Sequence, residues 1–166
     1  MDKKEKIAKD YFADLVYLDA EGNTKEEIFM NIALFAEKKR LTHDKILIYR
    51  KILDYEKAKG TTAVGCGIAC PEALLLYDLI RPFAFILCRT KNPIDFNAED
   101  GVSVRFILAS LSRTTKRISN LKQASYLTQF LKSEATREGF LKATTLKDVY
   151  NLFYELKAGK DGIKKD

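Results

Sequence analysis

The sequence predicts an α/β domain in which a mixed β-sheet is sandwiched between helices. Two helical patterns come first, three short runs rich in Val, Ile and Phe occupy the middle of the chain, and helical patterns return in the last third. The middle runs are apolar on both faces, as are strands inside a covered sheet. With 166 residues, 46% of them hydrophobic, the chain can bury one compact core. We expect an N-terminal lead over residues 1–13, a single domain over 14–157 and a flexible tail over 158–166.

One strand and two helices are expected in the first sixty residues. The apolar run 15–18 predicts a short strand that is followed by a polar turn. Thr24 and Glu27 have the spacing of a capping box, which predicts the start of a helix. A second helix is expected from Thr42 to a stop at Gly60. The expected apolar faces are Ile28, Ile32 and Phe35 in the first helix, and Ile46, Tyr49, Ile52 and Leu53 in the second.

The middle of the chain predicts three strands, over residues 64–70, 82–88 and 104–111, with turns at Asn92-Pro93 and Asp100-Gly101. A helix is then expected after Ser119, and Thr145 with Asp148 opens a final one. The expected apolar faces are Leu121, Ala124, Leu127 and Leu131 in the former, and Leu146, Val149, Leu152, Phe153 and Leu156 in the latter.

Composition narrows the classes of protein that the chain can represent. No apolar run approaches the roughly 18 residues of a membrane span, and residues 1–6 lead into no apolar export segment, so we expect a cytoplasmic protein. Three cysteines, Cys66, Cys70 and Cys88, form no even framework and fit a reducing compartment. They read as small buried hydrophobes rather than a metal site, because a closed zinc site needs four ligands and the single histidine, His43, lies elsewhere. No cofactor is expected.

The net charge of +6 is scattered along the chain, and nothing else favours a nucleic-acid partner. Residues 113–122 contain four basic residues and no acidic one, and that stretch has no interleaved aromatic residue. Its cations, Arg113, Lys116, Arg117 and Lys122, fit an ordinary solvated loop and helix start.

Two motifs carry a resemblance to a known family. Gly60-Thr61-Thr62, followed by Gly67-Ile68-Ala69-Cys70-Pro71-Glu72-Ala73, is similar to the family's Gly-Ser-Thr and Gly-Ile-Ala-x-Pro-His-Ala. Residues 93–104, which include Ile94-Asp95-Phe96 and Asp100-Gly101, are similar to Ile-Asp-Phe-x-Ala-x-Asp-Gly-x-x-Val. In this order they resemble the enzyme IIA domain, of the fructose, mannitol and nitrogen-regulatory type, of the bacterial phosphotransferase system. The similarity covers about residues 14–156 and implies that family's α/β fold.

The resemblance implies a chemistry that this sequence does not fully support. Members of the family receive a phosphoryl group on a histidine from the histidine-containing phosphocarrier protein and pass it to the B domain of a sugar permease, or use it as a regulatory mark. Carried over by position, that histidine falls on Glu72, a second histidine on Asn120 and an arginine on Glu56, whereas the family's Ser or Thr is retained as Thr61. We therefore expect a relative that lacks the phosphoacceptor histidine and acts as a non-catalytic regulatory or protein-binding protein.

Other interpretations stay open at this point. The chain is alternatively an active phosphocarrier that uses another acceptor, such as Glu72 or Cys70, or that belongs to a larger assembly. A small-molecule or cation sensor built on Glu56 and Glu72 is a third class. If the fold is of the IIA type, the loop with Arg113, Lys116 and Arg117 lies beside Glu72 and forms either a solvated loop or a rim that pairs with Glu72 and Glu56 or docks an acidic partner. The expected partner is a protein of the phosphotransferase system or a regulatory protein.

Overall fold

The computed structural model describes residues 15–153, without the side chains of residues 118–120. A helical segment over residues 146–153 closes the described part of the chain. The N-terminal lead, Leu156 and the tail of the sequence prediction lie outside the described residues. The elements in chain order are β1 (Val16–Ala20), α2 (Lys25–Lys38), α3 (Lys45–Lys59), β2 (Ala63–Gly65), β3 (Ile68–Ala69), β4 (Glu72–Leu75), β5 (Phe83–Ile94), β6 (Val104–Arg113), a 3-10 turn (Thr114–Lys116), α4 (Arg117–Leu131) and α5 (Glu134–Lys142).

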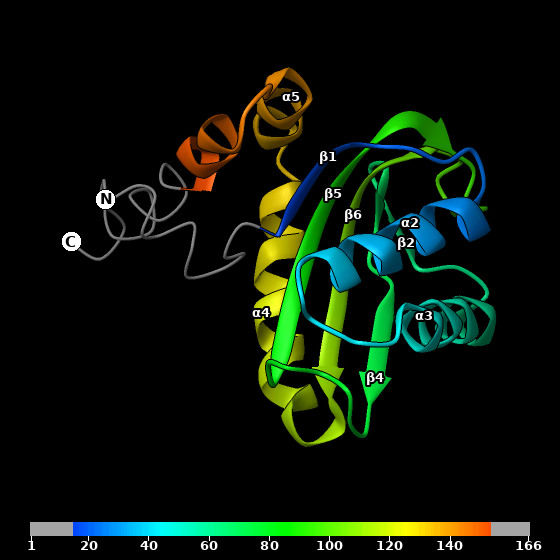
Figure 1. Cartoon of the computed structure of the whole chain (residues 1–166). Coiled ribbons are helices and arrows are strands. Elements are labelled where there is room, and N and C mark those ends of the chain that lie inside the picture. Colours follow the sequence, from blue (N-terminus) through cyan, green and yellow to red (C-terminus); the bar gives the residue numbers. More distant parts are fainter. Residues whose placement is uncertain (1–14, 154–166) are drawn as a thin grey trace, which may run out of the picture.

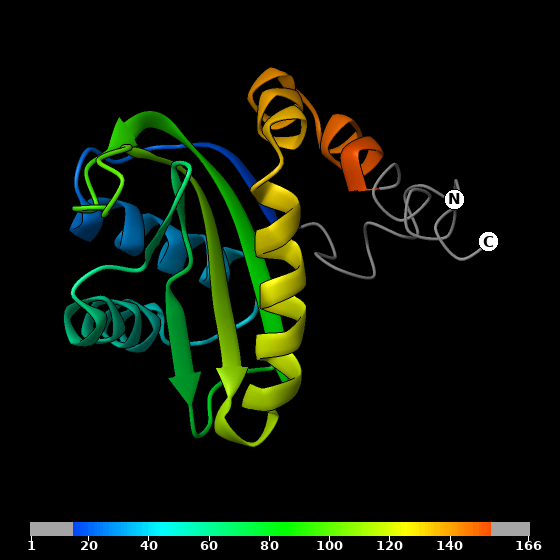
Figure 2. The ribbon, with the colours of Figure 1, turned by 180° about the vertical axis from the view of Figure 1, so that it is seen from behind.

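The strands form one mixed sheet in the order β1-β5-β6-β3-β2, and β4 also pairs with β6. β1 runs parallel to β5, and β3 and β4 run parallel to β6, whereas the β5–β6 and β2–β3 pairs are antiparallel. Helices α2 and α3 cover one face of the sheet (Figure 1), and α4 runs along the other (Figure 2). The predicted fold class, a mixed sheet between helices, is confirmed.

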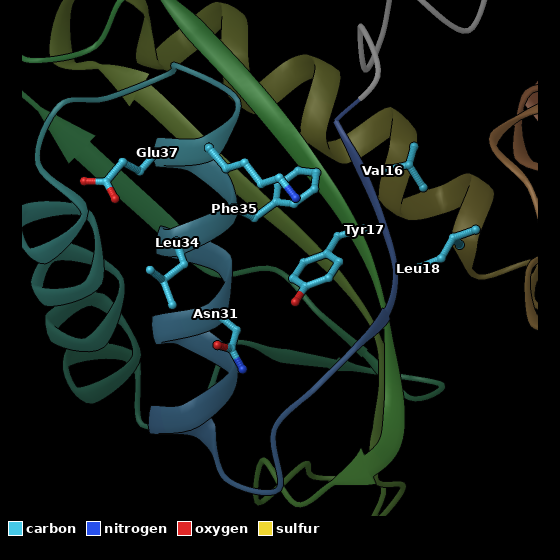
Figure 3. Close-up of a pocket in the computed structure, with 8 residues that line it drawn as sticks. Val16, Tyr17, Leu18, Asn31, Leu34, Phe35 and Glu37 are labelled. Carbon is cyan, nitrogen blue, oxygen red and sulfur yellow. The ribbon is translucent and has the colours of Figure 1, made fainter.

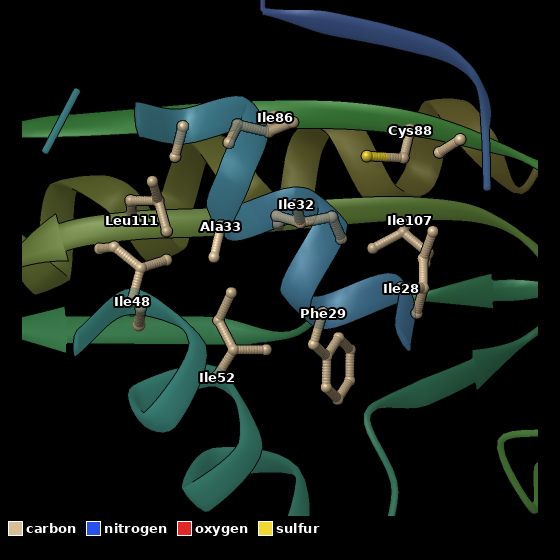
Figure 4. Close-up of a cluster of buried hydrophobic side chains, with 14 of the residues drawn as sticks. Ile28, Phe29, Ile32, Ala33, Ile48, Ile52, Ile86, Cys88, Ile107 and Leu111 are labelled. Atoms are coloured by element: carbon tan, nitrogen blue, oxygen red, sulfur yellow. The ribbon is translucent and has the colours of Figure 1, made fainter. Parts of the chain in front are cut away.

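Each face of the sheet buries its own apolar core. Side chains alternate along β5, so that Ile86 and Cys88 face α2 and α3 while Phe85 and Leu87 face α4. Figure 4 shows the first core, where side chains of both helices meet those of β5 and β6. Because the central strands are covered on both sides, their sequences carry apolar runs rather than strict alternation.

Both predicted capping boxes are present. The Thr24 hydroxyl accepts the N–H of Glu27 at 3.2 Å, and the Glu27 carboxylate accepts the N–H of Asn23 at 2.7 Å. At the last helical segment the Thr145 hydroxyl accepts the N–H of Asp148 at 3.2 Å, while the Asp148 carboxylate accepts the N–H of Thr145 at 2.9 Å. These side chains satisfy N–H groups that a helix start leaves unpaired.

The strand predictions need three corrections. Residues 64–70 form no single strand, because Cys66 and Gly67 adopt positive φ angles of 57° and 73° and turn the chain between β2 and β3. A Cβ at Gly67 would lie 3.1 Å from the carbonyl oxygen of Ser103, so this turn requires glycine. The predicted turn at Asn92-Pro93 is wrong: β5 continues to Ile94 through an irregular register at its end, where proline is tolerated. Strand β4 was not predicted.

The helix boundaries and faces also differ from the prediction. Asp44 caps α3, and the Thr42 hydroxyl instead accepts the N–H of Asp44 and donates to Asp78 at 2.7 Å. The buried face of α3 consists of Ile48, Ile52 and Glu56, whereas Ile46 is 41% exposed. Helix α4 begins two residues before Ser119, and its Leu121 is 45% exposed. Helix α5 was not predicted. Among residues 15–153, no helix is both long enough and apolar enough to cross a membrane.

Candidate functional site

A pocket of about 250 Å³ lies where α3, the β2–β4 segment and α4 meet. It contains Thr61 and Glu72, two of the positions to which the resemblance assigns the family's site, and the possible acceptor Cys70, but neither Glu56 nor the three cations of the expected rim. The lining residues are Tyr55, Lys59, Thr61, Thr62, Ala63, Val64, Cys70, Glu72, Ser110, Leu121 and Ala124.

Glu72 is the first residue of β4, where the backbone pairs it with Ser110 of β6. This strand position buries the carboxylate, leaving the side chain 5% exposed. Its Oε1 lies 3.5 Å from Nε of Arg117 and has no hydrogen-bond partner among the described residues. A separation of 3.5 Å makes this a loose ion pair, because charge-assisted N–H···O bonds are normally 2.7–2.9 Å long.

Tyr55 of α3 is the second polar group at this carboxylate. Burial raises the pKa of its phenol, and the negative charge of Glu72 and the hydrogen bond that the phenol donates to it raise that pKa further. The positive charge of Arg117 acts in the opposite direction. Because Glu72 and Arg117 both act on the pKa of Tyr55, the three side chains form one electrostatic cluster.

The sequence analysis grouped Glu56 with Glu72 as two carboxylates of one site. In the structure Glu56 does not line the pocket, and its negative charge is paired with a cation. Its Oε1 lies 2.8 Å from Nζ of Lys25, and its Oε2 accepts the N–H of Thr62 at 2.9 Å. The Lys25 ammonium also lies 5.2 Å from the centroid of the Phe96 ring. Glu56 is therefore neutralised behind the pocket wall and holds that wall through Thr62.

The two threonines of the pocket are used differently. The Thr61 hydroxyl donates to the carbonyl oxygen of Phe96 and accepts the N–H of Ala63 at 3.1 Å, so it joins the loop before β2 to the loop after β5. The buried hydroxyl of Thr62 has no hydrogen-bond partner among the described residues. Of the two, Thr62 is the one whose hydroxyl has bonding capacity left for a ligand.

Only one of the three expected rim cations reaches Glu72. Arg117 forms the loose pair described above, whereas Arg113 donates from Nη2 to the carbonyl oxygen of Leu79. Lys116 is exposed in the turn between β6 and α4. Asn120 lies in the first turn of α4, and its side chain is outside the described part of the structure.

Residues 11–156 match the family model described as "Phosphoenolpyruvate-dependent sugar phosphotransferase system, EIIA 2". The chain belongs to this family. No curated protein sequence matches it. The family resemblance carried by residues 60–73 and 93–104 is thereby confirmed.

Solved structures of EIIA proteins share the fold of this EIIA 2 chain. The nitrogen regulatory protein IIA-Ntr from Neisseria meningitidis is 22% identical, with a TM-score of 0.74 over 83% of this chain and 92% of that one. IIA mannitol from Escherichia coli is 21% identical, with a TM-score of 0.70 over 85% of this chain and 96% of that one. A third match, 21% identical with a TM-score of 0.68 over 86% and 96%, is a complex of Escherichia coli enzyme IIA mannitol with phosphorylated enzyme IIB mannitol.

The cysteines of this EIIA 2 chain lie in three different environments. Cys66 is exposed, Cys88 is buried in the core, and Cys70 lines the pocket with its Sγ 3.4 Å from the Thr128 hydroxyl. Burial raises the pKa of the Cys70 thiol, which disfavours the nucleophilic thiolate. His43 is exposed, and residues 15–153 contain no cluster of His, Cys, Asp and Glu side chains suited to a metal ion.

A larger hollow of about 650 Å³ lies at the opposite edge of the sheet, between β1 and α2. Figure 3 shows Tyr17 and Phe35 there. Their rings stack, and the ring centroids are 4.8 Å apart. None of the positions to which the resemblance assigns the family's site lines this hollow. The smaller pocket at Glu72 is therefore the candidate site of this EIIA 2 chain.

Sequence reasoning missed Tyr55, Lys59 and Ser110 in the pocket and Lys25 behind it. A local signal existed for α3, because Glu56 follows Ile48 and Ile52 at intervals of four residues and so shares their buried face. A buried carboxylate requires a cation or several donors, which Lys25 and the Thr62 N–H supply. The partner itself comes from another helix, and no local pattern could have identified it.

Proposed function

We propose that this EIIA 2 chain does not carry a phosphoryl group at the family's site and acts as a protein-binding, regulatory relative of the phosphocarriers. The observation that carries the proposal is the buried carboxylate of Glu72, the residue onto which the resemblance of residues 67–73 to the family motif places the phosphorylated histidine. The pocket around it is retained and serves as part of an interaction surface.

The chemistry of phosphoryl transfer supports this reading. A neutral imidazole nitrogen accepts the group, and nearby donors stabilise its charge. The chain contains a single histidine, His43, which is exposed and does not line the pocket. An incoming phosphoryl group, with nearly two negative charges, would meet the buried carboxylate of Glu72, with the loosely paired Arg117 and the exposed Lys59 as the cations at the pocket.

Retained activity through another acceptor is the competing hypothesis. Glu72 would have to form an acyl phosphate, and Cys70 would have to ionise although burial raises its pKa. The conditions around both side chains oppose phosphorylation, and the experiment below decides between the two hypotheses.

The test is incubation of the purified protein with radiolabelled phosphoenolpyruvate, enzyme I and the histidine-containing phosphocarrier protein. The expected result is no stoichiometric label, while Escherichia coli IIA mannitol becomes labelled under the same conditions. Stoichiometric label on this chain would contradict the proposal. The variants Glu72→Gln and Cys70→Ala, together with acid and hydroxylamine sensitivity, would then identify the acceptor.

Protein binding is supported by the family and by one similar structure. Enzyme IIA mannitol of Escherichia coli, 21% identical to this chain, is found in a complex with phosphorylated enzyme IIB mannitol. By analogy, we assign to this chain a protein partner that contacts the face containing Glu72 and Arg117. Such a partner reads the charge of that face rather than exchanging a phosphoryl group with it.

A further inference from the structure

We propose that the pocket at Glu72 binds a small zwitterion of the α-amino-acid class, with its ammonium group against Glu72 and Thr62 and its carboxylate toward Arg117 and Lys59. This inference rests on the proposed function only in requiring that Glu72 stays an unmodified carboxylate. It places a positive group of the ligand at Glu72, where phosphoryl transfer would place a negatively charged group.

The floor of the pocket offers unused hydrogen-bond acceptors. The Glu72 side chain is 5% exposed, and its Oε1 has no hydrogen-bond partner among the described residues. The hydroxyl of Thr62, a residue that is 6% exposed, is in the same condition. Both residues line the pocket, together with Ser110, which is also 6% exposed. An ammonium group has three N–H donors and satisfies such a set of buried oxygens.

Two cations belong to the site: Arg117 contacts Glu72 without lining the pocket, and Lys59 lines it. The Arg117 side chain is 48% exposed, and its Nε lies 3.5 Å from Glu72, too far for a good hydrogen bond. Arg117 therefore balances the charge of Glu72 while keeping hydrogen-bonding capacity for a second carboxylate. Lys59 is exposed, lines the pocket and lies with its Nζ 5.6 Å from the centroid of the Tyr55 ring.

This order of charges discriminates between classes of ligand. A simple cation would be repelled by Arg117 and Lys59, and a simple anion would be repelled by the carboxylate of Glu72. A molecule with an ammonium group at one end and a carboxylate at the other matches both ends of the site. Burial of the ammonium group is tolerated only because the carboxylate of Glu72 forms an ion pair with it.

Size and walls restrict the ligand further. The pocket volume of about 250 Å³ is below the usual range for drug-sized ligands. Apolar side chains complete its walls, namely Ala63, Val64, Leu121 and Ala124. An amino acid with a small aliphatic side chain fits such walls better than one with a second charge.

The experiment is a titration of the ¹⁵N-labelled protein with each of the standard amino acids, followed by its amide spectrum. For small aliphatic amino acids we expect saturable shifts at residues 59–63, 72 and 110, with a dissociation constant of roughly 0.1–1 mM for a ligand of this size. Propylamine and propionate, which each carry one of the two charges, should bind at least about tenfold more weakly.

Matched variants connect the binding to the named residues. Glu72→Gln keeps the shape and removes the charge, and Arg117→Gln removes the cation that pairs with it; each should weaken binding about tenfold or more. Lys116→Gln removes the neighbouring exposed cation and should leave the affinity unchanged. If Glu72→Gln does not fold, as its amide spectrum would show, Arg117→Gln compared with Lys116→Gln decides the question.

Absence of saturable shifts with every amino acid would overturn the inference. So would an unchanged affinity in both pocket variants, or propionate binding as tightly as the amino acids. The titration contains no phosphotransferase protein, so its failure would leave the proposed function untouched. Conversely, stoichiometric phosphorylation would refute the proposed function while leaving a measured affinity of the unmodified protein intact.

Discussion

The ammonium of Lys25 lies 2.8 Å from the carboxylate of Glu56, and this pair joins the first turn of α2 to the buried face of α3. The Glu56 side chain is 4% exposed and that of Lys25 is 16% exposed. The second oxygen of Glu56 holds the backbone N–H of Thr62, so the ion pair also fixes one wall of the pocket. The negative charge of Glu56, where the resemblance led us to expect the family's arginine, is thus balanced by a cation on another helix.

Removing the charge of Glu56 should destabilise the protein. In Glu56→Gln the ammonium of Lys25 stays largely buried without its counter-charge, and breaking a buried pair in this way typically costs about 3 kcal/mol. The free energy of unfolding in urea measures this loss. Glu37→Gln is the matched control, because the Lys45–Glu37 pair has a similar length of 3.0 Å but both side chains are 37% exposed. That control should cost no more than about 1 kcal/mol; equal losses would contradict the prediction.

Restoring the family's nucleophile alone should not restore phosphoryl transfer. We expect Glu72→His to accept little label, since catalytic groups act as a unit and Glu56 and Asn120 would still differ from the family. The measurement is the rate of labelling with radiolabelled phosphoenolpyruvate and the general phosphotransferase proteins. A rate for the single variant that equals that of an ordinary IIA domain would show that the rest of the pocket is already competent.

The triple change Glu56→Arg, Glu72→His, Asn120→His should transfer phosphoryl groups better than the single one. The structure adds a condition, because Glu56→Arg places a guanidinium against the ammonium of Lys25. Adding Lys25→Gln to the triple variant should therefore recover folding stability, and labelling should be compared in that background. Labelling no better than that of Glu72→His alone would contradict the expectation.

The charge of Glu72 should matter to a protein partner, because a carboxylate partly mimics a phosphorylated histidine. For a partner isolated by pull-down and then purified, Glu72→Gln should change the affinity by roughly 0.2–1 kcal/mol and reduce its salt dependence. Isothermal titration at two salt concentrations measures both effects. If the affinity and the salt dependence stay the same, Glu72 has no role as a charge mimic.

Arg89 of β5 should control the attachment of α5. Its Nη1 donates to the carbonyl oxygens of Phe140 at 2.7 Å and Ala143 at 2.6 Å, and its Nη2 to Asp19 at 2.9 Å. Arg89→Met leaves these carbonyls unpaired, at a cost of about 1–3 kcal/mol. Hydrogen exchange should accelerate in α5 but not in α3. Uniform acceleration of both helices would show a general rather than a local effect.

Stability should fall as the solution becomes alkaline. Burial raises the pKa values of Cys70 and Cys88 above the ordinary 9.0, and those of Tyr17 and Tyr55 above 10.0. The unfolded chain therefore loses these protons first, so the contribution is fully present below about pH 9 and is lost as pH rises toward the folded pKa values. Urea unfolding at about pH 8 and about pH 10.5 measures the fall. Cys88→Ala should reduce its slope, whereas Cys66→Ala, at an exposed position, should not; a stability that rises with pH would contradict the sign.

The sequence was sufficient for features governed by local chemistry. Thr24 with Glu27 and Thr145 with Asp148 mark helix starts because their side chains bind N–H groups within the same turn. Features governed by tertiary contacts were missed or misplaced. Ile46 belongs to the apolar pattern of α3 but lies on its exposed side, because the sheet is contacted by Ile48 and Ile52 instead.

In the candidate site, too, the features set by local sequence were predicted and those set by tertiary contacts were not. The family motifs located Glu72 and Thr61 in the pocket, since both lie within a contiguous segment whose pattern resembles the family's. The separation of Glu56 from the pocket that contains Glu72 was not predictable. It depends on the direction of the Glu56 side chain and on its partner Lys25, which lies far away in sequence. Arg113 and Arg117 are equally basic in the sequence, and only the backbone path after β6 separates their partners.

The position of β6 in the chain affects how the sheet can form during synthesis on the ribosome. This strand is the sheet neighbour of β3, β4 and β5, yet it is the last strand in the described part of the chain. Synthesis proceeds from the N-terminus, so β3, β4 and β5 emerge with their apolar residues before the strand with which all three pair. The sheet can close only after Arg113 has left the exit tunnel, and until then its earlier strands depend on protection from aggregation.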